Sequence, residues 1–388
     1  MDTSRDGADF DLVIIGASFA GLAAARTAAA RGLRVAVLEA KTEPGARIHT
    51  TGILVREAIE EIDIPHHLTR RVPGVRLYSP NLTHADLFSP GYSFYTTRTA
   101  DLVRWMACAA EAAGAEIRCG ARFTGAERAG DLLHLAGSGL TTRFLIGADG
   151  ARSAVARAFG LARNARFLTG LEVEVEPDPT IDPRLLHCFI DSRLAPGYLA
   201  WIAPGPDVLQ LGLAVRPGAR PDLEAFLARV ERHLGFAPRI VGRRSGRIPC
   251  GGPLSRIGAP GVLLIGDAAG WVSPMTGGGI RSAFRFGRRA AAMVVDHLQN
   301  GGPAPEIALV REVPKVRLKR LMRRALDLAP PNLVVDTALA LPAVRAAAER
   351  IYFHRRGGAG LDRAAYLRWL DEQRGKAIAA PEAPKQIV

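Results

Sequence analysis

The feature that most constrains this chain is a glycine-bearing turn that directly follows an apolar run. Residues Phe10–Ile15 are typical of a fully buried strand, and a G-x-S-x-x-G pattern then leads into an Ala-rich helical stretch, residues 19–31. Gly16 permits a tight turn out of the strand, and Gly21 lets the helix pack closely on the sheet. The spacing therefore predicts a βα turn that binds a dinucleotide.

The amides at the start of this helix would hold the pyrophosphate, because the helix dipole favours an anion there. They belong to Ser18, Phe19, Ala20 and Gly21. A second short strand, residues 34–38, is followed by Glu39 and Ala40. An acidic residue at this place accepts hydrogen bonds from the adenosine ribose and disfavours a 2′-phosphate. The alternative is a glycine-containing turn without a ligand.

A second glycine segment lies far along the chain. Residues 262–265 are typical of a buried strand, and Gly266 and Asp267 end it. We expect Asp267 to bind ribitol hydroxyls. Pro274 then fixes a turn, and Gly277, Gly278 and Gly279 let the backbone approach a flat ring before a helix begins at Ile280. The alternative for these three glycines is a flexible loop. Taken together, however, the two glycine segments predict an FAD-binding site.

Asp149, in a GADG turn after the strand at residues 143–148, is a weaker candidate for the same site.

Composition limits the classes of protein. The formal net charge is +13, but aromatic residues make up only 6% and no nucleic-acid motif is present, so no nucleic-acid partner is expected. An anionic membrane surface, an anionic substrate, or a surface on which arginine has no specific role all remain open. The four cysteines are widely spaced and form no Cys-x-x-Cys, so we expect no disulfide framework and no metal site. The N-terminus lacks signal-peptide features, which favours a cytoplasmic location.

The pattern of elements predicts an interrupted organisation. Nucleotide-binding βα units open the chain and resume near residue 250, with short alternating runs typical of an antiparallel sheet between them. We expect an α/β fold with four parts: an FAD-binding domain (9–71, 98–165 and 250–305), a substrate domain (72–97 and 166–249), a helical region (306–375) and a disordered tail (376–388).

Three motifs in this order resemble one superfamily: GASFAG with Glu39, GADGARS, and GDAAGWVSPMTGGGI. They are similar to FAD-dependent enzymes with the p-hydroxybenzoate hydroxylase fold. Within this superfamily, residues 273–280 and Gly287 resemble the geranylgeranyl reductase family. The hydroxylase branch usually has Asn soon after the glycines, whereas this chain has Arg281 and Ser282. The resemblance covers most of the first 300 residues and implies a Rossmann-like FAD-binding domain with an inserted β substrate domain.

The resemblance also implies site residues. Tyr198 and Trp201 lie in a stretch similar to the reductases' aromatic strand, which faces the flavin and the lipid chain; sheet core is the alternative. Arg98 matches an arginine near the flavin, with a surface residue as the alternative. The family's Cys is replaced by His49, which could supply a proton because imidazole titrates near neutral pH, or could be merely structural.

The function implied is transfer of a hydride from reduced flavin to a carbon–carbon double bond of a prenyl-type substrate. NAD(P)H or a protein such as ferredoxin would reduce the flavin. Two alternatives stay open: a flavin monooxygenase that hydroxylates or epoxidises, and a non-catalytic flavin sensor or electron carrier.

Residues 314–329 have a further pattern. Six basic residues alternate with apolar residues that fall on one helical face. Such a helix can lie on an anionic bilayer, which would place the protein peripherally at the inner membrane face. The alternative is a helix packed on the domain with its basic face in solvent.

Overall fold

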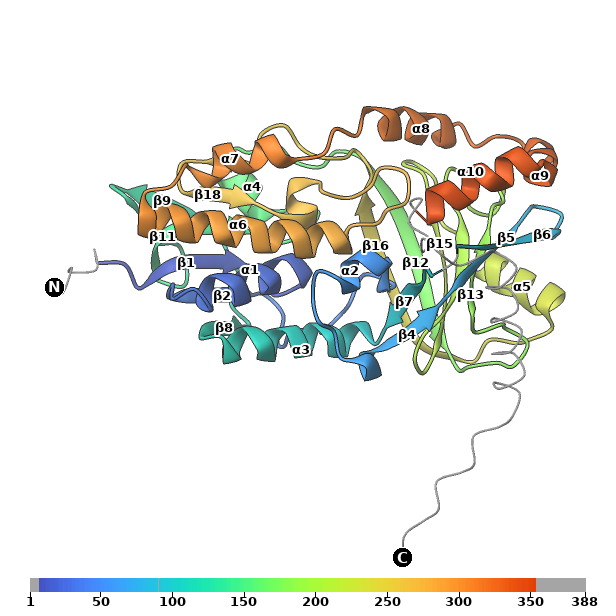
Figure 1. Cartoon of the computed structure of the whole chain (residues 1–388), viewed down its shortest axis with the longest axis horizontal. Helices are drawn as coiled ribbons and strands as arrows, with labels where there is room; N and C mark the ends of the chain where they lie inside the picture. Colours follow the sequence, from blue (N-terminus) through green and yellow to red (C-terminus); the bar gives the residue numbers. More distant parts are fainter. Residues whose placement is uncertain (1–6, 90, 354–388) are drawn as a thin grey trace, which may run out of the picture.

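The computed structural model describes residues 7–89 and 91–353. Two large sheets lie one after the other along the longest axis of the molecule, and C-terminal helices run along one side of both (Figure 1). The expected tail (376–388) and the end of the expected helical region (354–375) lie outside the described residues.

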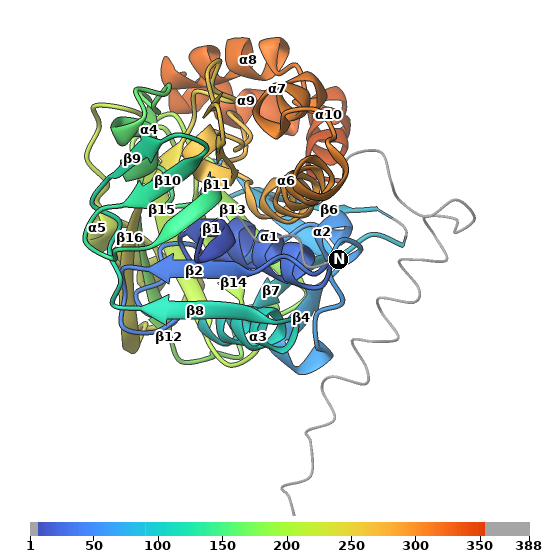
Figure 2. The same ribbon diagram turned by 90° about the vertical axis from the view of Figure 1, so that its left-hand side faces the viewer.

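The first sheet contains the expected nucleotide-binding strands. Its order is β17-β18-β11-β1-β2-β8, and β9 and β10 extend it from β11. The strands from β18 to β8 are parallel. Figure 2 looks onto this end of the molecule. The bounds are β1 (Phe10–Ile15), β2 (Val35–Glu39), β8 (Ala115–Cys119), β9 (Ala126–Ala129), β10 (Leu132–Leu135), β11 (Thr141–Gly147), β17 (Gly258–Ala259) and β18 (Val262–Leu264).

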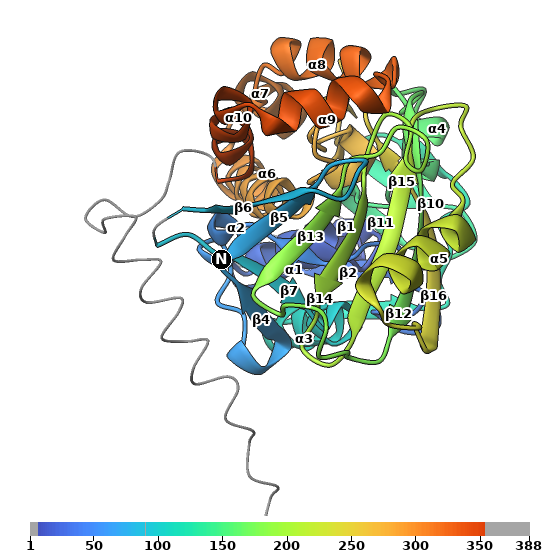
Figure 3. The same ribbon diagram turned by 90° about the vertical axis from the view of Figure 1, so that its right-hand side faces the viewer.

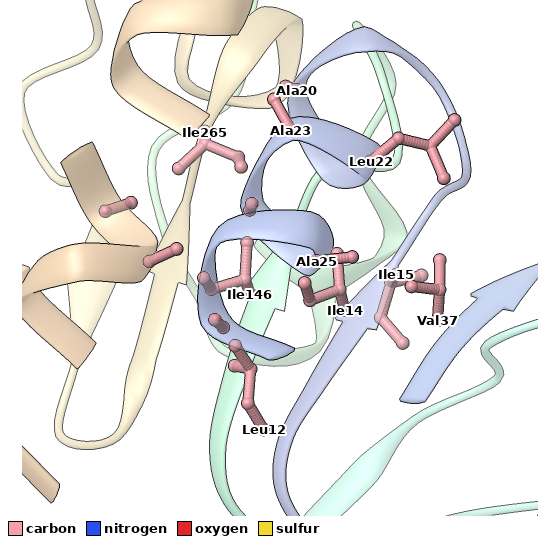
Figure 4. Close-up of a cluster of buried hydrophobic side chains, with 14 of the residues drawn as sticks. Leu12, Ile14, Ile15, Ala20, Leu22, Ala23, Ala25, Val37, Ile146 and Ile265 are labelled. Atoms are coloured by element: carbon pink, nitrogen blue, oxygen red, sulfur yellow. The ribbon is translucent and has the colours of Figure 1, made fainter. Parts of the chain in front are cut away.

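Helices on this sheet bury its apolar strands. The Ala-rich helix α1 (Phe19–Ala29) packs closely against α6 (Ile280–Asn300) and α3 (Thr99–Ala112). The short side chains of α1 permit this, and Leu12, Ile14 and Ile146 are fully buried around it (Figure 4). Burial of such aliphatic side chains contributes roughly 1.5–3 kcal/mol each.

The second sheet carries the inserted β segment. Its order is β16-β12-β15-β14-β13-β5-β6, and it is antiparallel except where β13 meets β5. Helix α5 (Leu223–Leu234) covers one face (Figure 3). The bounds are β5 (Gly74–Tyr78), β6 (His84–Phe88), β12 (Phe167–Val175), β13 (Leu185–Phe189), β14 (Ala200–Pro204), β15 (Leu209–Val215) and β16 (Ile240–Pro249).

Smaller elements join the two sheets. A three-stranded sheet has the order β3-β7-β4, with β3 (Ile53–Leu54), β7 (Phe94–Thr97) and β4 (Thr69–Val72). The remaining helices are α2 (Arg56–Ile59), η1 (His66–Leu68), α4 (Ala154–Ala158), η2 (Gly266–Ala269), α7 (Pro305–Glu312), α8 (Arg317–Asp327), α9 (Asn332–Ala340) and α10 (Pro342–Tyr352). Among residues 7–89 and 91–353, no helix is both long and apolar enough to cross a membrane.

Candidate FAD site

The first glycine segment makes the turn that its sequence predicts. Gly16 follows β1 with φ of +107°, and a Cβ there would lie 2.5 Å from the carbonyl oxygen of Ala148. A Cβ on Gly21 would lie 2.0 Å from the carbonyl oxygen of Gly16. A side chain would not fit at either position, so the close approach of turn, helix and sheet requires glycine.

The start of α1 offers free amides. Ser18 is the N-cap residue, and its side chain makes no capping hydrogen bond in the described structure. The first intrahelical bond runs from Leu22 N to Ser18 O, so the amides of Phe19, Ala20 and Gly21 have no intrahelical acceptor. Uncapped amides at a positive helix end fit a pyrophosphate.

Glu39 lies at the end of β2, beside this turn. Its Oε2 accepts from Ala17 N at 2.8 Å, and its Oε1 accepts from Lys41 N at 2.9 Å. The residue is buried, whereas the following Ala40 is exposed. Each carboxylate oxygen can accept a second hydrogen bond, so Glu39 can hold the turn and still accept from ribose hydroxyls.

The second glycine segment meets the first in space. Gly266 has φ of +58°, and a Cβ there would lie 2.9 Å from the Cβ of Ala20 in α1. A Cβ on Gly287 in α6 would lie 2.5 Å from the carbonyl oxygen of Ala20. The N-terminal regions of the two helices therefore border one site.

Asp267 follows Gly266 and points toward the start of α6. A Cβ on Gly279 would lie 3.3 Å from its Oδ1. Burial raises the pKa of Asp267 to about 6, and no described cation offsets this. Such a carboxyl group gains stability from hydroxyl donors, which the ribitol chain of FAD provides.

The turn between η2 and α6 is closed by its own backbone. Ser273 N donates to Gly278 O, and Gly277 N donates to Ser273 O, both at 3.0 Å. Pro274 lies inside this turn, and Gly277 has φ of +64°. Gly279 is the N-cap of α6 and makes no side-chain cap, and the first intrahelical bond runs from Ala283 N to Gly279 O, so the amides of Ile280, Arg281 and Ser282 have no intrahelical acceptor.

Of the two predicted aromatic residues, Tyr198 lies beside this turn, whereas Trp201 contacts Glu172 and Gly212 in the second sheet. The hydroxyl of Tyr198 donates to the carbonyl oxygen of Thr276 at 2.5 Å. Tyr198, Trp201 and Ile248 each pack against the buried cluster of Leu168, Ala214 and Cys250, and a Cβ on Gly277 would lie 3.0 Å from the Tyr198 hydroxyl and 3.3 Å from Ile248. Tyr198 and Ile248 therefore connect this part of the second sheet to the glycine turn.

His49 lies on the loop before β3, and its Nδ1 is 2.8 Å from the carbonyl oxygen of Ser245 in β16. This hydrogen bond fastens the loop to the second sheet. The structure gives His49 a structural contact, and its proposed role as proton donor stays a prediction.

Two other predicted residues have structural partners. Arg98 forms an exposed ion pair with Asp207. Asp149 Oδ2 accepts from the amides of Ala154 at 2.6 Å and Val155 at 3.1 Å, and so caps α4. Both remain candidates for cofactor binding, as predictions.

Three residues of this region were not predicted from the sequence: Glu172, Thr51 and Arg244. The fold brings them together beside Trp201. Glu172 is buried and accepts from Thr51 Oγ1 and Trp201 Nε1. A signal existed only in the alternation of β12, where Glu172 and Glu174 stand among valines. The arrangement fits FAD, because two uncapped helix ends, a turn that tolerates no side chain, and the half-buried carboxyl group of Asp267, which has no described cation beside it, border the same place.

Comparison with known proteins agrees with this assignment. The family model described as "FAD binding domain" matches residues 9–235, more than half of the chain. A digeranylgeranylglycerophospholipid reductase of Methanothrix thermoacetophila is 33% identical over 76% of this chain and 80% of its own. One from Methanosarcina acetivorans is 30% identical over 75% of this chain and 76% of its own.

Solved structures share the fold. A geranylgeranyl bacteriochlorophyll reductase-like protein of Thermoplasma acidophilum has a TM-score of 0.76 at 21% identity, over 89% of this chain and 97% of its own. PqsL of Pseudomonas aeruginosa, a probable FAD-dependent monooxygenase, has a TM-score of 0.62 at 20% identity, over 89% and 98%. The expected fold class is confirmed, and the chain belongs to the geranylgeranyl reductase family of FAD-dependent oxidoreductases.

Proposed function

We propose that this enzyme reduces carbon–carbon double bonds of a prenyl lipid. The main support for this proposal is the hydrogen bond from the Tyr198 hydroxyl to the carbonyl oxygen of Thr276. This bond joins the start of the aromatic stretch to the glycine turn of the candidate FAD site. Tyr198 and Trp201 would line the place where an apolar chain meets the flavin. The reductase names of the relatives support the same reaction.

In this proposal, different residues of the chain bind different parts of the cofactor. The amides at the starts of α1 and α6 would receive the pyrophosphate, Glu39 the adenosine ribose, and Asp267 the ribitol chain. When bound and reduced, FAD supplies a hydride to the substrate. The work of the chain is to orient substrate and to exclude water.

The electron donor is either NAD(P)H, visiting the flavin transiently, or a reduced ferredoxin. The sequence has no second glycine-rich nucleotide motif, so NAD(P)H as donor would meet the flavin without a nucleotide-binding motif of its own. Anaerobic flavin reduction by each donor, followed by its absorbance, separates the two.

We further propose that α8 lies on an anionic membrane, at its cytoplasmic face. The helix docks by its polar side: Arg320 donates to the carbonyl oxygens of Gly251 and Pro253, and the buried Arg323 donates to that of Gly197. Its leucines instead face solvent. This is the reverse of an ordinary surface helix.

The exposed side of α8 has the chemistry of an interfacial helix. Leu318, Leu321 and the following Leu328 are 68%, 63% and 80% exposed. Exposed basic side chains surround them: Lys315, Arg317, Lys319 and Arg324. Figure 1 shows α8 along the outer edge of the molecule. Apolar side chains flanked by basic ones favour an anionic bilayer.

Lipid extracts of cells with and without this protein test the reaction. Mass spectrometry should show prenyl species that gain hydrogens in pairs when the protein is present. A gain of one oxygen would instead support a monooxygenase. No change in any prenyl species would support a non-catalytic flavoprotein.

A further inference from the structure

A cleft of about 440 Å³ lies between α5, the loop that joins β13 to β14, and the start of α9. Helices α5 and α9 lie at the end of the molecule away from the first sheet, and Figure 3 faces this end. The volume is within the range of small-molecule sites, roughly 300–1,000 Å³. The cleft is therefore large enough for an organic ligand.

Basic side chains predominate in the lining of this cleft. Arg193 comes from the loop, and Arg229, Arg232 and His233 come from α5. Among the described lining residues, Asp191 supplies the one carboxyl group. A concave surface with this excess of positive charge attracts an anion.

The carboxyl group of Asp191 is already used by the protein itself. The residue is buried, and its Oδ1 accepts from the amide of Arg193 at 2.9 Å and from Nδ2 of Asn332 at 2.8 Å. Its Oδ2 lies 3.2 Å from Nη1 of Arg229, and Nη2 of the same guanidinium donates to the carbonyl oxygen of Pro80. Asp191 therefore neutralises Arg229 and ties the loop to α5 and α9.

Arg193 and Arg232 are the arginines that remain for a ligand. Both are exposed, and within residues 7–89 and 91–353 neither guanidinium has a hydrogen bond or an ion pair. They reach the cleft from different elements, and Asp191 fixes the loop that carries Arg193. Guanidinium groups match phosphate oxygens with pairs of parallel N–H donors, so two of them suit a phosphate group.

Small side chains keep the cleft open beside these arginines. Ala225 and Ala228 line it, each one helical turn before an arginine of α5, Arg229 or Arg232. Helix α9 begins at Asn332, which also lines the cleft, so the positive end of its dipole borders the same space. The two alanines offer apolar surface for the organic part of a phosphate ester.

We propose that this cleft binds the phosphate group of an organic phosphate, with Arg193 and Arg232 on the phosphate oxygens. The site is separate from the candidate FAD site, which is built from α1, η2 and α6, and it does not depend on the proposed reduction. The phosphate can belong to a soluble ester or to a phospholipid headgroup, since both present the same oxygens.

Calorimetric titration of the FAD-loaded protein with glycerol 3-phosphate tests the soluble source. Loading with FAD keeps the probe from the free amides of the cofactor site. Arg193→Ala with Arg232→Ala should weaken binding by about tenfold or more, because charged hydrogen bonds to the phosphate are lost. The matched control is Arg157→Ala with Arg220→Ala, which removes the same charge from exposed positions outside the cleft and should bind like wild type.

Sedimentation with vesicles tests the lipid source. Phosphatidylcholine vesicles that contain phosphatidic acid are compared with vesicles brought to the same surface charge by a fatty acid, whose headgroup has no phosphate. Leu318→Ser with Leu321→Ser is the background for every protein, so that binding through α8 does not enter the comparison. A lipid source predicts a preference for phosphatidic acid that disappears with the Arg193 and Arg232 substitutions and persists in the matched control.

Binding of either probe that depends on Arg193 and Arg232 supports the site, and the probe that binds identifies the source. Thermal melting checks that both double variants remain folded, as exposed positions predict. The proposal is overturned if the wild type binds neither probe, or if the cleft variant and the matched control bind both probes equally well.

Discussion

Gly287 of α6 lies directly against Ala20 of α1, and a Cβ on Gly287 would come within 2.5 Å of the Ala20 carbonyl oxygen. This contact brings the two distant glycine segments to one site. Glycine inside a helix normally costs about 1 kcal/mol relative to alanine, so its use here reflects the close approach.

Gly287→Ala should therefore destabilise the protein, although alanine is the better helix former. The clash is with backbone, which cannot move aside cheaply, and overpacking of this kind costs about 1–3 kcal/mol. Thermal unfolding and the FAD content of the purified protein are the measurements. Gly125→Ala is the control, because the nearest atom to its Cβ would lie 3.9 Å away. Equal melting temperatures for the two variants would contradict the prediction.

Glu39→Ala should lower both stability and FAD affinity. It leaves the buried amide of Ala17 without its acceptor, which costs about 1–3 kcal/mol. Urea unfolding of the cofactor-free protein and titration with FAD measure the two effects. Glu60→Ala, which removes only an exposed pair with Arg56, should change the free energy of unfolding by less than about 0.5 kcal/mol. An FAD affinity equal to wild type would exclude Glu39 from the site.

Asp267 should make the cofactor-free protein less stable as pH rises. Its pKa is about 6 when folded, above the ordinary value of 3.8, so the folded state holds the proton more tightly. Stability from this group is complete below about pH 4 and is lost as pH rises toward 6 and beyond. Asp267→Asn should remove this loss, and raise stability above pH 6, while weakening FAD binding. Urea midpoints across this pH range are the measurement. A variant with the same pH dependence as wild type would contradict the account.

Leu318→Ser with Leu321→Ser should reduce binding to anionic vesicles by about tenfold, because apolar area is lost from the bilayer contact. Stability should hardly change, since both side chains are exposed. Sedimentation with vesicles that contain an anionic phospholipid is the measurement. Val241→Ser, an exposed apolar position on β16, is the control. If the double variant binds the vesicles as well as wild type does, α8 does not form the membrane-binding surface.

The two glycine segments could be predicted because their constraints are local. Gly16 and Gly277 adopt positive φ values within short turns, and the strands and helices around them have clear apolar periodicity. The helix at residues 19–31 ends two residues earlier than expected, at Ala29, because Gly32 turns the chain with φ of +85°. The division into domains remains a prediction.

The cluster around Glu172 could not be predicted, because its members come from distant segments. Thr51, Trp201 and Arg244 meet Glu172 only when β12 pairs with β16 and the loop closes over them. In the sequence, Glu172 and Glu174 look like the polar face of an edge strand.

The orientation of α8 on the protein could not be predicted either, because it also depends on residues that are distant in the sequence. The pattern predicts which side is apolar, but not which side packs on the protein. That depends on carbonyl oxygens of Gly197, Gly251 and Pro253, which receive Arg323 and Arg320. These acceptors lie outside the helix and far from it in the sequence.

The central claim is tested most directly by a single anaerobic turnover. Purified protein with FAD, chemically reduced and mixed with a geranylgeranyl-bearing phospholipid, should reoxidise its flavin. Mass spectrometry should then find lipid that has gained two hydrogens per flavin oxidised. Lipid of unchanged mass beside reduced flavin, with an oxygenated product only after air is admitted, would contradict the account.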